Sequence, residues 1–236
     1  MGDDGLNRPK AIRPKAVCLC SGGMDSTVAA TIAKGEGYEI YLFHVGYGQK
    51  AERKELEAVT RIARVLEART MKAVHTDLFW NLSALTTAKA HLPVGDEVDI
   101  QNPSSTPPTW VCCRNLVLGS MAAAYAEAVG AEKVYVGFNA EEARSYPDNR
   151  PEFVERFNPL LEKSVASFSR PPVIEAPLIS LFKSDIVSLG AKLGAPLELT
   201  WSCYLEGETH CGECEACQHR MRGFEEAGVV DPTGYR

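Results

Sequence analysis

Runs of apolar residues alternate along the chain with segments of helical periodicity. Short apolar runs at residues 16–20 and 38–48 are typical of strands buried inside a sheet, and residues 71–78 and 133–138 predict two further strands. Residues 25–37, 51–68 and 114–130 have the spacing of helices, and the second of them carries one apolar face made of Leu56, Val59, Ile62, Ala63 and Leu66. Strands that alternate with helices predict an α/β fold with a doubly wound parallel sheet covered on both faces.

The alternation is interrupted once and ends near residue 200. Residues 80–110 are rich in Pro, Ser and Asp, and a loop of this length inside a compact domain is often functional or mobile. A helix at 151–166, a short strand near 173–178 and a helix at 183–193 follow. We expect a disordered leader at 1–15, an α/β domain at 16–199, and a small cysteine-rich segment with a short final helix at 200–236.

Composition and charge narrow the class of protein. The 236 residues are 45% hydrophobic and 24% charged, as in a soluble globular domain. The net charge of −6 disfavours a long nucleic-acid groove, so no direct nucleic-acid partner is expected. No apolar run approaches the ~20 residues of a membrane helix, and the polar N-terminus lacks the apolar stretch of a secretory signal. These features predict a cytoplasmic protein with no membrane partner.

The stretch "CSGGMDST", residues 20–27, lies between the first strand and the first helix. Ligands of open parallel sheets bind at the carboxyl ends of strands, and a helix N-terminus attracts phosphate. Gly22 and Gly23 allow a close backbone approach, and hydroxyls add donors. Asp25 would repel phosphate and is expected to cap the helix, orient a loop or hold a metal. The loop has neither the Walker A lysine nor G-x-G-x-x-G spacing, and the alternative is a tight capped turn.

A second cluster lies in "TWSCYLEGETHCGECEACQHR". Its cysteines have the spacing C-x7-C-x2-C-x2-C, and four thiolates suit a tetrahedral structural zinc site. An iron–sulfur cluster is the alternative, although the C-P signature is missing. The candidate ligands are Cys203, Cys211, Cys214 and Cys217. The other four, Cys18, Cys20, Cys112 and Cys113, are expected to be core residues.

The motifs together resemble a known family. "SGGMDST" resembles the pyrophosphate loop of PP-loop ATP pyrophosphatases, whose fold is adenine nucleotide alpha-hydrolase-like. With "YGQKAERKE", "YPDNRPEF", "PLISLFKSDIVSLG", the cysteine-rich tail and "DPTGY" in this order, residues 16–235 resemble the 7-cyano-7-deazaguanine synthase family. That family uses two ATP to convert 7-carboxy-7-deazaguanine and ammonia into the nitrile, through an adenylate and an amide, for queuosine or archaeosine.

The resemblance implies a role for particular residues. The ATP-binding residues would be Ser21, Gly22, Gly23, Met24, Asp25, Ser26, Thr27 and Lys183. The catalytic residues would be Asp25, Ser26, Lys183 and Arg114. The deazaguanine pocket would be lined by Tyr146, Asp148, Arg150, Arg114 and Asn115, with Asp148 accepting from the base and an arginine meeting the carboxylate. The resemblance also implies ATP, Zn²⁺ and Mg²⁺ as cofactors, and a homodimer.

Two segments depart from the family pattern. "VCCRN" stands where the family commonly has Val-Pro-Gly-Arg-Asn, and "SYPDNR" where it has Gly-Tyr-Pro-Asp-Cys-Arg. These departures leave two alternatives open. The first is a paralogue that adenylates the same acid and joins it to another amine, such as a protein N-terminus, so that the product stays an amide. The second is a non-catalytic nucleotide-binding zinc scaffold.

Overall fold

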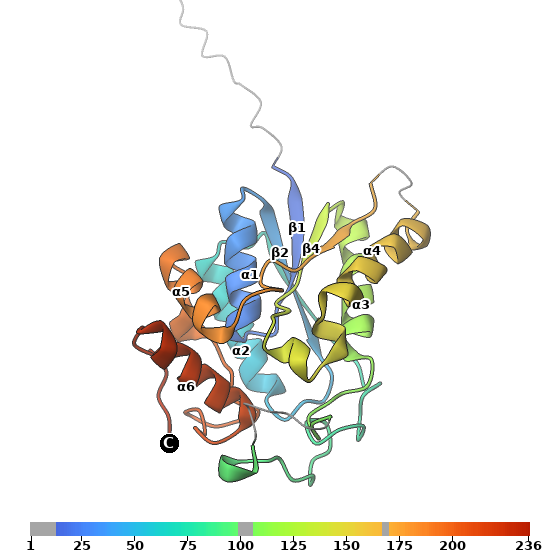
Figure 1. Cartoon of the computed structure of the whole chain (residues 1–236). Coiled ribbons are helices and arrows are strands. Elements are labelled where there is room, and N and C mark those ends of the chain that lie inside the picture. Colours follow the sequence, from blue (N-terminus) through green and yellow to red (C-terminus); the bar gives the residue numbers. More distant parts are fainter. Residues whose placement is uncertain (1–12, 99–105, 167–169) are drawn as a thin grey trace, which may run out of the picture.

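The computed structural model describes residues 13–98, 106–166 and 170–236 (Figure 1). Most of the expected leader, residues 1–12, and residues 99–105 of the expected long loop lie outside the described residues. Within the described part, no helix combines the length and the apolar character needed to cross a bilayer.

The core of the molecule is a five-stranded sheet in which every pairing is parallel. The strands are β1 (Lys15–Leu19), β2 (Glu39–Gly46), β3 (Thr70–His75), β4 (Lys133–Tyr135) and β5 (Val173–Glu175), in the order β3-β2-β1-β4-β5. The short apolar runs therefore form the parallel sheet that the sequence predicts.

Helices cover both faces of the sheet (Figure 1). The helices α1 (Met24–Gly35) and α2 (Glu52–Val65) pack on one face, and α5 (Lys183–Leu193) and α6 (Glu215–Ala227) pack beside α1. The other face is covered by α3 (Arg114–Val129) and α4 (Pro151–Ser164). Short 3-10 turns lie at Gly95–Glu97, Glu142–Arg144, Pro147–Asn149 and Leu197–Leu199. This arrangement confirms the doubly wound α/β fold.

The strand β3 is largely exposed, because it is an edge strand of the sheet and pairs only with β2. One detail of the predicted core is wrong. Leu56, which was expected on the apolar face of α2, has 36% of its surface exposed, whereas Val59 and Ile62 are fully buried. The buried stripe of α2 is thus narrower than the apolar positions of its sequence.

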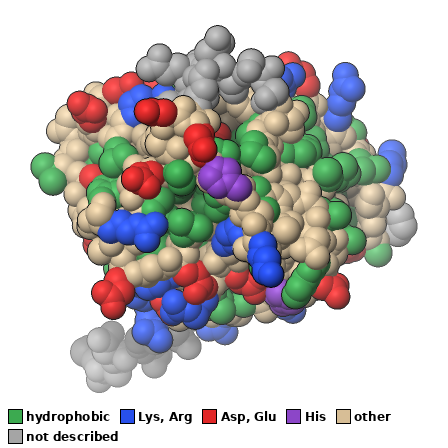
Figure 2. Space-filling view, turned by 90° about the horizontal axis from the view of Figure 1, so that it is seen from below, with side chains coloured by type: hydrophobic (Ala, Val, Ile, Leu, Met, Phe, Trp, Pro, Cys, Tyr) green, Lys and Arg blue, Asp and Glu red, His purple; other side chains and the backbone are tan. Residues whose placement is uncertain are grey.

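The strand order creates a switch point between β1 and β4. From β1 the chain proceeds to β2 and β3 on one side, whereas β4 and β5 lie on the other. The connections at the carboxyl ends of β1 and β4 therefore diverge and leave a crevice between them. Figure 2 shows this end of the molecule, where basic, acidic and hydrophobic side chains are interspersed.

Candidate active site

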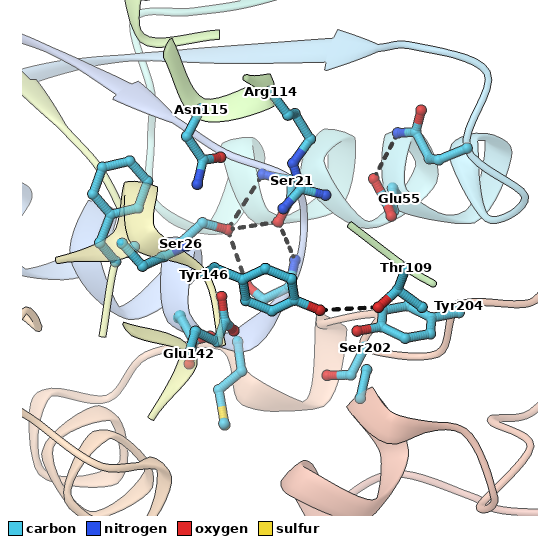
Figure 3. A pocket seen from close by; sticks show the side chains of 18 of the residues that line it. Ser21, Ser26, Glu55, Thr109, Arg114, Asn115, Glu142, Tyr146, Ser202 and Tyr204 are labelled. Atoms are coloured by element: carbon cyan, nitrogen blue, oxygen red, sulfur yellow. Dashed lines mark hydrogen bonds between the residues drawn. The ribbon is translucent and has the colours of Figure 1, made fainter. Parts of the chain in front are cut away.

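A cavity of about 260 Å³ occupies this crevice (Figure 3). Its walls are the loop after β1, the beginnings of α1 and α3, the segment after β4, and the cysteine-rich tail. The predicted residues that line it are Ser21, Gly23, Met24, Asp25, Ser26, Arg114, Asn115, Tyr146 and Lys183. The structure therefore brings together residues that are distant in the sequence.

The loop after β1 is closed by its own hydrogen bonds. The Ser26 Oγ lies 3.2 Å from both the Ser21 Oγ and the Gly23 carbonyl oxygen, and the Thr27 Oγ1 donates to that carbonyl at 2.8 Å. Gly22 has a φ of +86°, and a Cβ there would lie 2.7 Å from the Glu55 carbonyl oxygen. Only glycine fits this position without moving α2. Thr27 is fully buried and does not reach the cavity.

The helix α1 begins at this loop without a side-chain cap. Its N-cap is Gly23, and no side chain makes a capping hydrogen bond there. Of the three roles expected for Asp25, helix capping is therefore not the one this structure shows. The unpaired N–H groups of the first turn and the positive end of the helix dipole favour an anionic ligand such as a phosphate.

Asp25 instead forms an ion-pair cluster with α5. The Lys183 ammonium, from the first residue of α5, donates to one oxygen of Asp25 and, at 3.1 Å, to Glu142. Burial by itself would lower the pKa of Lys183, but the two carboxylates raise it above its ordinary value. The other oxygen of Asp25 is buried and has no hydrogen-bond partner among the described residues. The cluster thus holds a charged lysine beside the loop after β1.

A second ion-pair cluster lies next to the first. Glu141 is 7% exposed and accepts hydrogen bonds from His219 and Arg222, both on α6. It also accepts from the Lys183 backbone N–H at 3.2 Å. Burial, followed by the nearby Lys183 ammonium, lowers the pKa of His219. The contacts connect the segment after β4 with the beginning of α5 and with the tail.

Arg114 supplies a cation on the opposite wall. Its guanidinium donates to the Tyr47 hydroxyl at 3.0 Å and stacks over that ring, 5.8 Å from its centre. Among the described residues, no carboxylate forms a salt bridge with Arg114. A planar donor group without a carboxylate partner beside a cavity is suited to bind the carboxylate of a ligand.

Asp148 and Arg150 do not reach the cavity. Asp148 is 7% exposed, and its Oδ2 accepts from the Asn115 backbone N–H at 3.3 Å. It therefore stabilises the first turn of α3, whose unpaired N–H groups favour a carboxylate. The Arg150 guanidinium is exposed and donates to the Ala143 carbonyl at 3.0 Å. The structure thus places neither residue in the wall of this cavity, although the resemblance implies that both line the deazaguanine pocket.

Several lining residues were not singled out from the sequence. Glu55 ends the "YGQKAERKE" motif, and its carboxylate accepts from Gln49 Nε2 at 2.8 Å. Burial raises the pKa of Glu55 to about 7. Thr109 and Glu215 come from the long loop and the start of α6. Glu55 and Glu215 occur within recognisable motifs, but their side chains had no assigned direction until the fold was known.

The four tail cysteines form a buried cluster that can hold a metal ion. The sulfur atoms all lie within 4.8 Å of one another, and those of Cys211 and Cys217 are 3.8 Å apart. Four sulfurs at about 2.3 Å from a tetrahedral zinc ion would be about 3.8 Å apart. Backbone N–H groups donate to the sulfurs of Cys203 and Cys211 at 3.3–3.4 Å. The donor set therefore fits a structural zinc site.

The remaining thiols divide into two pairs. Cys18 and Cys20 are buried in the core, as predicted. Cys112 and Cys113 are both exposed, so the prediction that they pack in the core is wrong. They follow an irregular segment, where no periodicity indicates which side chains face inward.

Comparisons with known proteins agree with these features. A family model described as "Queuosine biosynthesis protein QueC" matches residues 15–228. A 7-cyano-7-deazaguanine synthase from Methanothrix thermoacetophila is 66% identical over 222 residues, which are 94% of this chain and 99% of that protein. Proteins of the same name from Methanospirillum hungatei and Sulfurovum are 40% and 42% identical over 94% of this chain, and the matches cover 100% and 98% of those proteins.

Proposed function

The chain belongs to the QueC family of queuosine biosynthesis enzymes, and we propose that it is an ATP-dependent ligase that converts 7-carboxy-7-deazaguanine and ammonia into 7-cyano-7-deazaguanine. The observation that carries this proposal is one cavity that combines an anion-binding helix N-terminus, a charged lysine and an arginine without a carboxylate partner. These groups complement ATP and an organic carboxylate at the same site.

The phosphates of ATP would lie against the loop after β1. The first N–H groups of α1 and the backbone of Gly23 would donate to phosphate oxygens. Lys183 would turn from its carboxylate partners to the phosphates and stabilise the pyrophosphate that leaves. The free oxygen of Asp25 and the nearby Glu142 are suitable ligands for a Mg²⁺ ion that accompanies the nucleotide.

Arg114 would hold the carboxylate of the substrate facing the α-phosphorus. In the first step, a carboxylate oxygen attacks that phosphorus, and the bond to pyrophosphate breaks. Ammonia then attacks the acyl carbon, AMP leaves, and a proton is lost to give the amide. In the second round, the amide oxygen attacks the α-phosphorus of a second ATP, and pyrophosphate leaves. Loss of AMP and of the two N–H protons then gives the nitrile. Holding the reacting groups in line is the main contribution of the protein.

For the tail, we propose that the four cysteines bind zinc rather than an iron–sulfur cluster. A zinc ion held by four thiolates has no open position and would supply structural stability, not chemistry. Its proposed ligands lie in the hydrophobic core with residues of β2 and α2. A colourless protein with about one zinc per chain is expected by metal analysis, whereas a brown protein would favour iron–sulfur.

The proposed reaction can be tested by following the two carboxylate oxygen atoms of the substrate, since each should end in a different AMP molecule. When the substrate carboxylate carries ¹⁸O in both positions, each of the two AMP molecules should contain one ¹⁸O atom, and the product should contain none. Mass spectrometry of AMP and of the deazaguanine product measures this directly. A product that stops at the amide and retains one label would instead support the paralogue that couples the acid to another amine. Absence of pyrophosphate release would support a non-catalytic scaffold.

A further inference from the structure

Five acidic side chains line the cavity: Asp25, Glu55, Glu141, Glu142 and Glu215. Lys183 pairs with two of them, and a histidine and an arginine of α6 pair with a third. Glu55 lies under the phosphate loop and accepts from Gln49. Glu215 belongs to none of the ion pairs between described residues. Its surroundings therefore differ from those of the other four.

Hydroxyl groups fix the orientation of the Glu215 carboxylate. Its Oε2 lies 3.3 Å from the Thr109 Oγ1 and 3.2 Å from the Tyr204 hydroxyl. The Thr109 Oγ1 has a single proton, and it also lies 2.9 Å from the Tyr146 hydroxyl. Thr109 thus donates to Glu215 and accepts from the Tyr146 hydroxyl, the contact drawn in Figure 3. The other oxygen, Oε1, has no hydrogen-bond partner among the described residues and is free to accept from a ligand.

Flat aromatic side chains surround this carboxylate. The Tyr146 ring lines the cavity and is supported from behind by Trp110, with parallel planes 13° apart and centres 5.7 Å apart. Tyr204 contributes a second ring to the lining. Glu215 and Arg114 both act electrostatically on the Tyr146 hydroxyl, so an anion and a cation lie near the same ring. A ligand that fits here is planar, with N–H donors on one edge and a carboxylate elsewhere.

We propose that Glu215 recognises the deazaguanine by accepting hydrogen bonds from its ring N–H and its exocyclic 2-amino group. This inference rests on the proposed function, because 7-carboxy-7-deazaguanine has that donor edge and, on its five-membered ring, the carboxylate that Arg114 would bind. A carboxylate has only acceptors, so it matches two adjacent donors. Glu55 is a poorer match, since a carboxyl that is half-protonated near pH 7 presents a donor as well.

The 2-amino group offers a direct test by binding measurements. We compare 7-carboxy-7-deazaguanine with its 2-desamino analogue, which keeps the ring N–H and the carboxylate, by calorimetry on the metal-loaded protein. The wild type should bind the 2-amino compound roughly ten- to a hundredfold more tightly, because the analogue leaves one acceptor of a charged group unpaired. Glu215→Gln should reduce the ratio to about threefold or less, since its amide presents a donor to the 2-amino group.

Two controls keep the test independent of folding. Glu213→Gln removes the same charge on the other side of Cys214, but this side chain is exposed, so the wild-type ratio should remain. The ratio of the two dissociation constants, measured on one protein sample, does not depend on the fraction of folded protein. The affinity for ATP should change less than threefold in Glu215→Gln. A variant that keeps the full preference for the 2-amino compound would overturn the role of Glu215. A wild type that binds neither acid would overturn the proposed function itself.

Discussion

The charge of Glu55 depends on the fold, because its carboxyl group is desolvated in the folded protein. Burial raises its pKa from 4.5 to about 7, so the folded protein binds this proton more tightly than the unfolded chain. The free energy of unfolding should therefore fall as the pH rises from about 4.5 to about 7. The loss is at most about 3 kcal/mol, and less because solvent reaches part of the side chain.

Glu55→Gln should remove this part of the pH dependence. The amide keeps the shape and can still pair with Gln49, but it carries no charge to desolvate. Urea unfolding at pH 5 and pH 8 should show that the variant gains stability relative to the wild type at the higher pH. Glu57→Gln, on the exposed side of the same helix, is the matched control. An identical pH slope in wild type and Glu55→Gln would contradict the assignment.

At the scale of elements, the start of α3 explains one departure from the family pattern. Cys113, the N-cap of this helix, has φ 54° and ψ 21°, in the left-handed region. It stands where the resemblance places a glycine, which adopts this conformation without strain. The backbone turn is therefore retained although the glycine is replaced. The Arg114 side chain that follows keeps its place in the cavity wall.

Cys113→Gly should consequently stabilise the protein. Relief of the left-handed strain exceeds the extra entropy of glycine in the unfolded chain, and the net gain should be about 0.5–1 kcal/mol. Thermal and urea unfolding measure the change. Cys113→Ser retains the strain and removes the thiol, so it should unfold like the wild type. If the serine variant were stabilised equally, the gain would come from loss of the thiol and not from the backbone.

The elements themselves were largely predictable, and their side-chain directions were not. The helix at Lys183–Leu193 has the predicted bounds, because a charged first turn, an apolar stripe and a following glycine mark it in the sequence. Asp148 shows where prediction of a side-chain direction from the sequence fails. It lies within a motif of the family, yet its carboxylate binds the start of α3, 33 residues earlier in the chain. Only tertiary packing decides whether such a carboxylate caps a helix or faces a ligand.

At the scale of the whole molecule, the tail is part of the cavity. The Trp201 N–H donates to the Gly22 carbonyl at 2.9 Å, and the backbone N–H of Gly95 donates to the Glu213 carbonyl at 3.0 Å. The tail cysteines pack in the same hydrophobic cluster as Leu42. No periodicity in the sequence could have indicated these contacts, because they join irregular segments. The predicted division at residue 199 therefore does not separate the phosphate loop from its neighbours.

Removal of the proposed zinc ion should therefore weaken nucleotide binding as well as the fold. Dialysis against a chelator, or Cys214→Ser, should lower the unfolding temperature by about 10 °C or more, because four buried thiols lose the ion that joins them. ATP affinity, measured below that unfolding temperature, should fall in parallel as the chelator removes the metal. Cys112→Ser changes an exposed thiol and should alter neither quantity. Unchanged ATP affinity in the metal-free protein would show that the tail holds its position without the ion.

The hydrogen bond between the backbone groups of Trp201 and Gly22 forms late during synthesis, because residue 201 is made long after residue 22. The ribosome makes the phosphate loop and the first four strands well before residues 201–219, which complete the wall of the cavity. A nascent chain thus has the anion-binding turn but lacks Glu215 and the two α6 side chains that engage Glu141. Under the proposed function, the protein would therefore activate a carboxylate only after the tail has left the exit tunnel and docked.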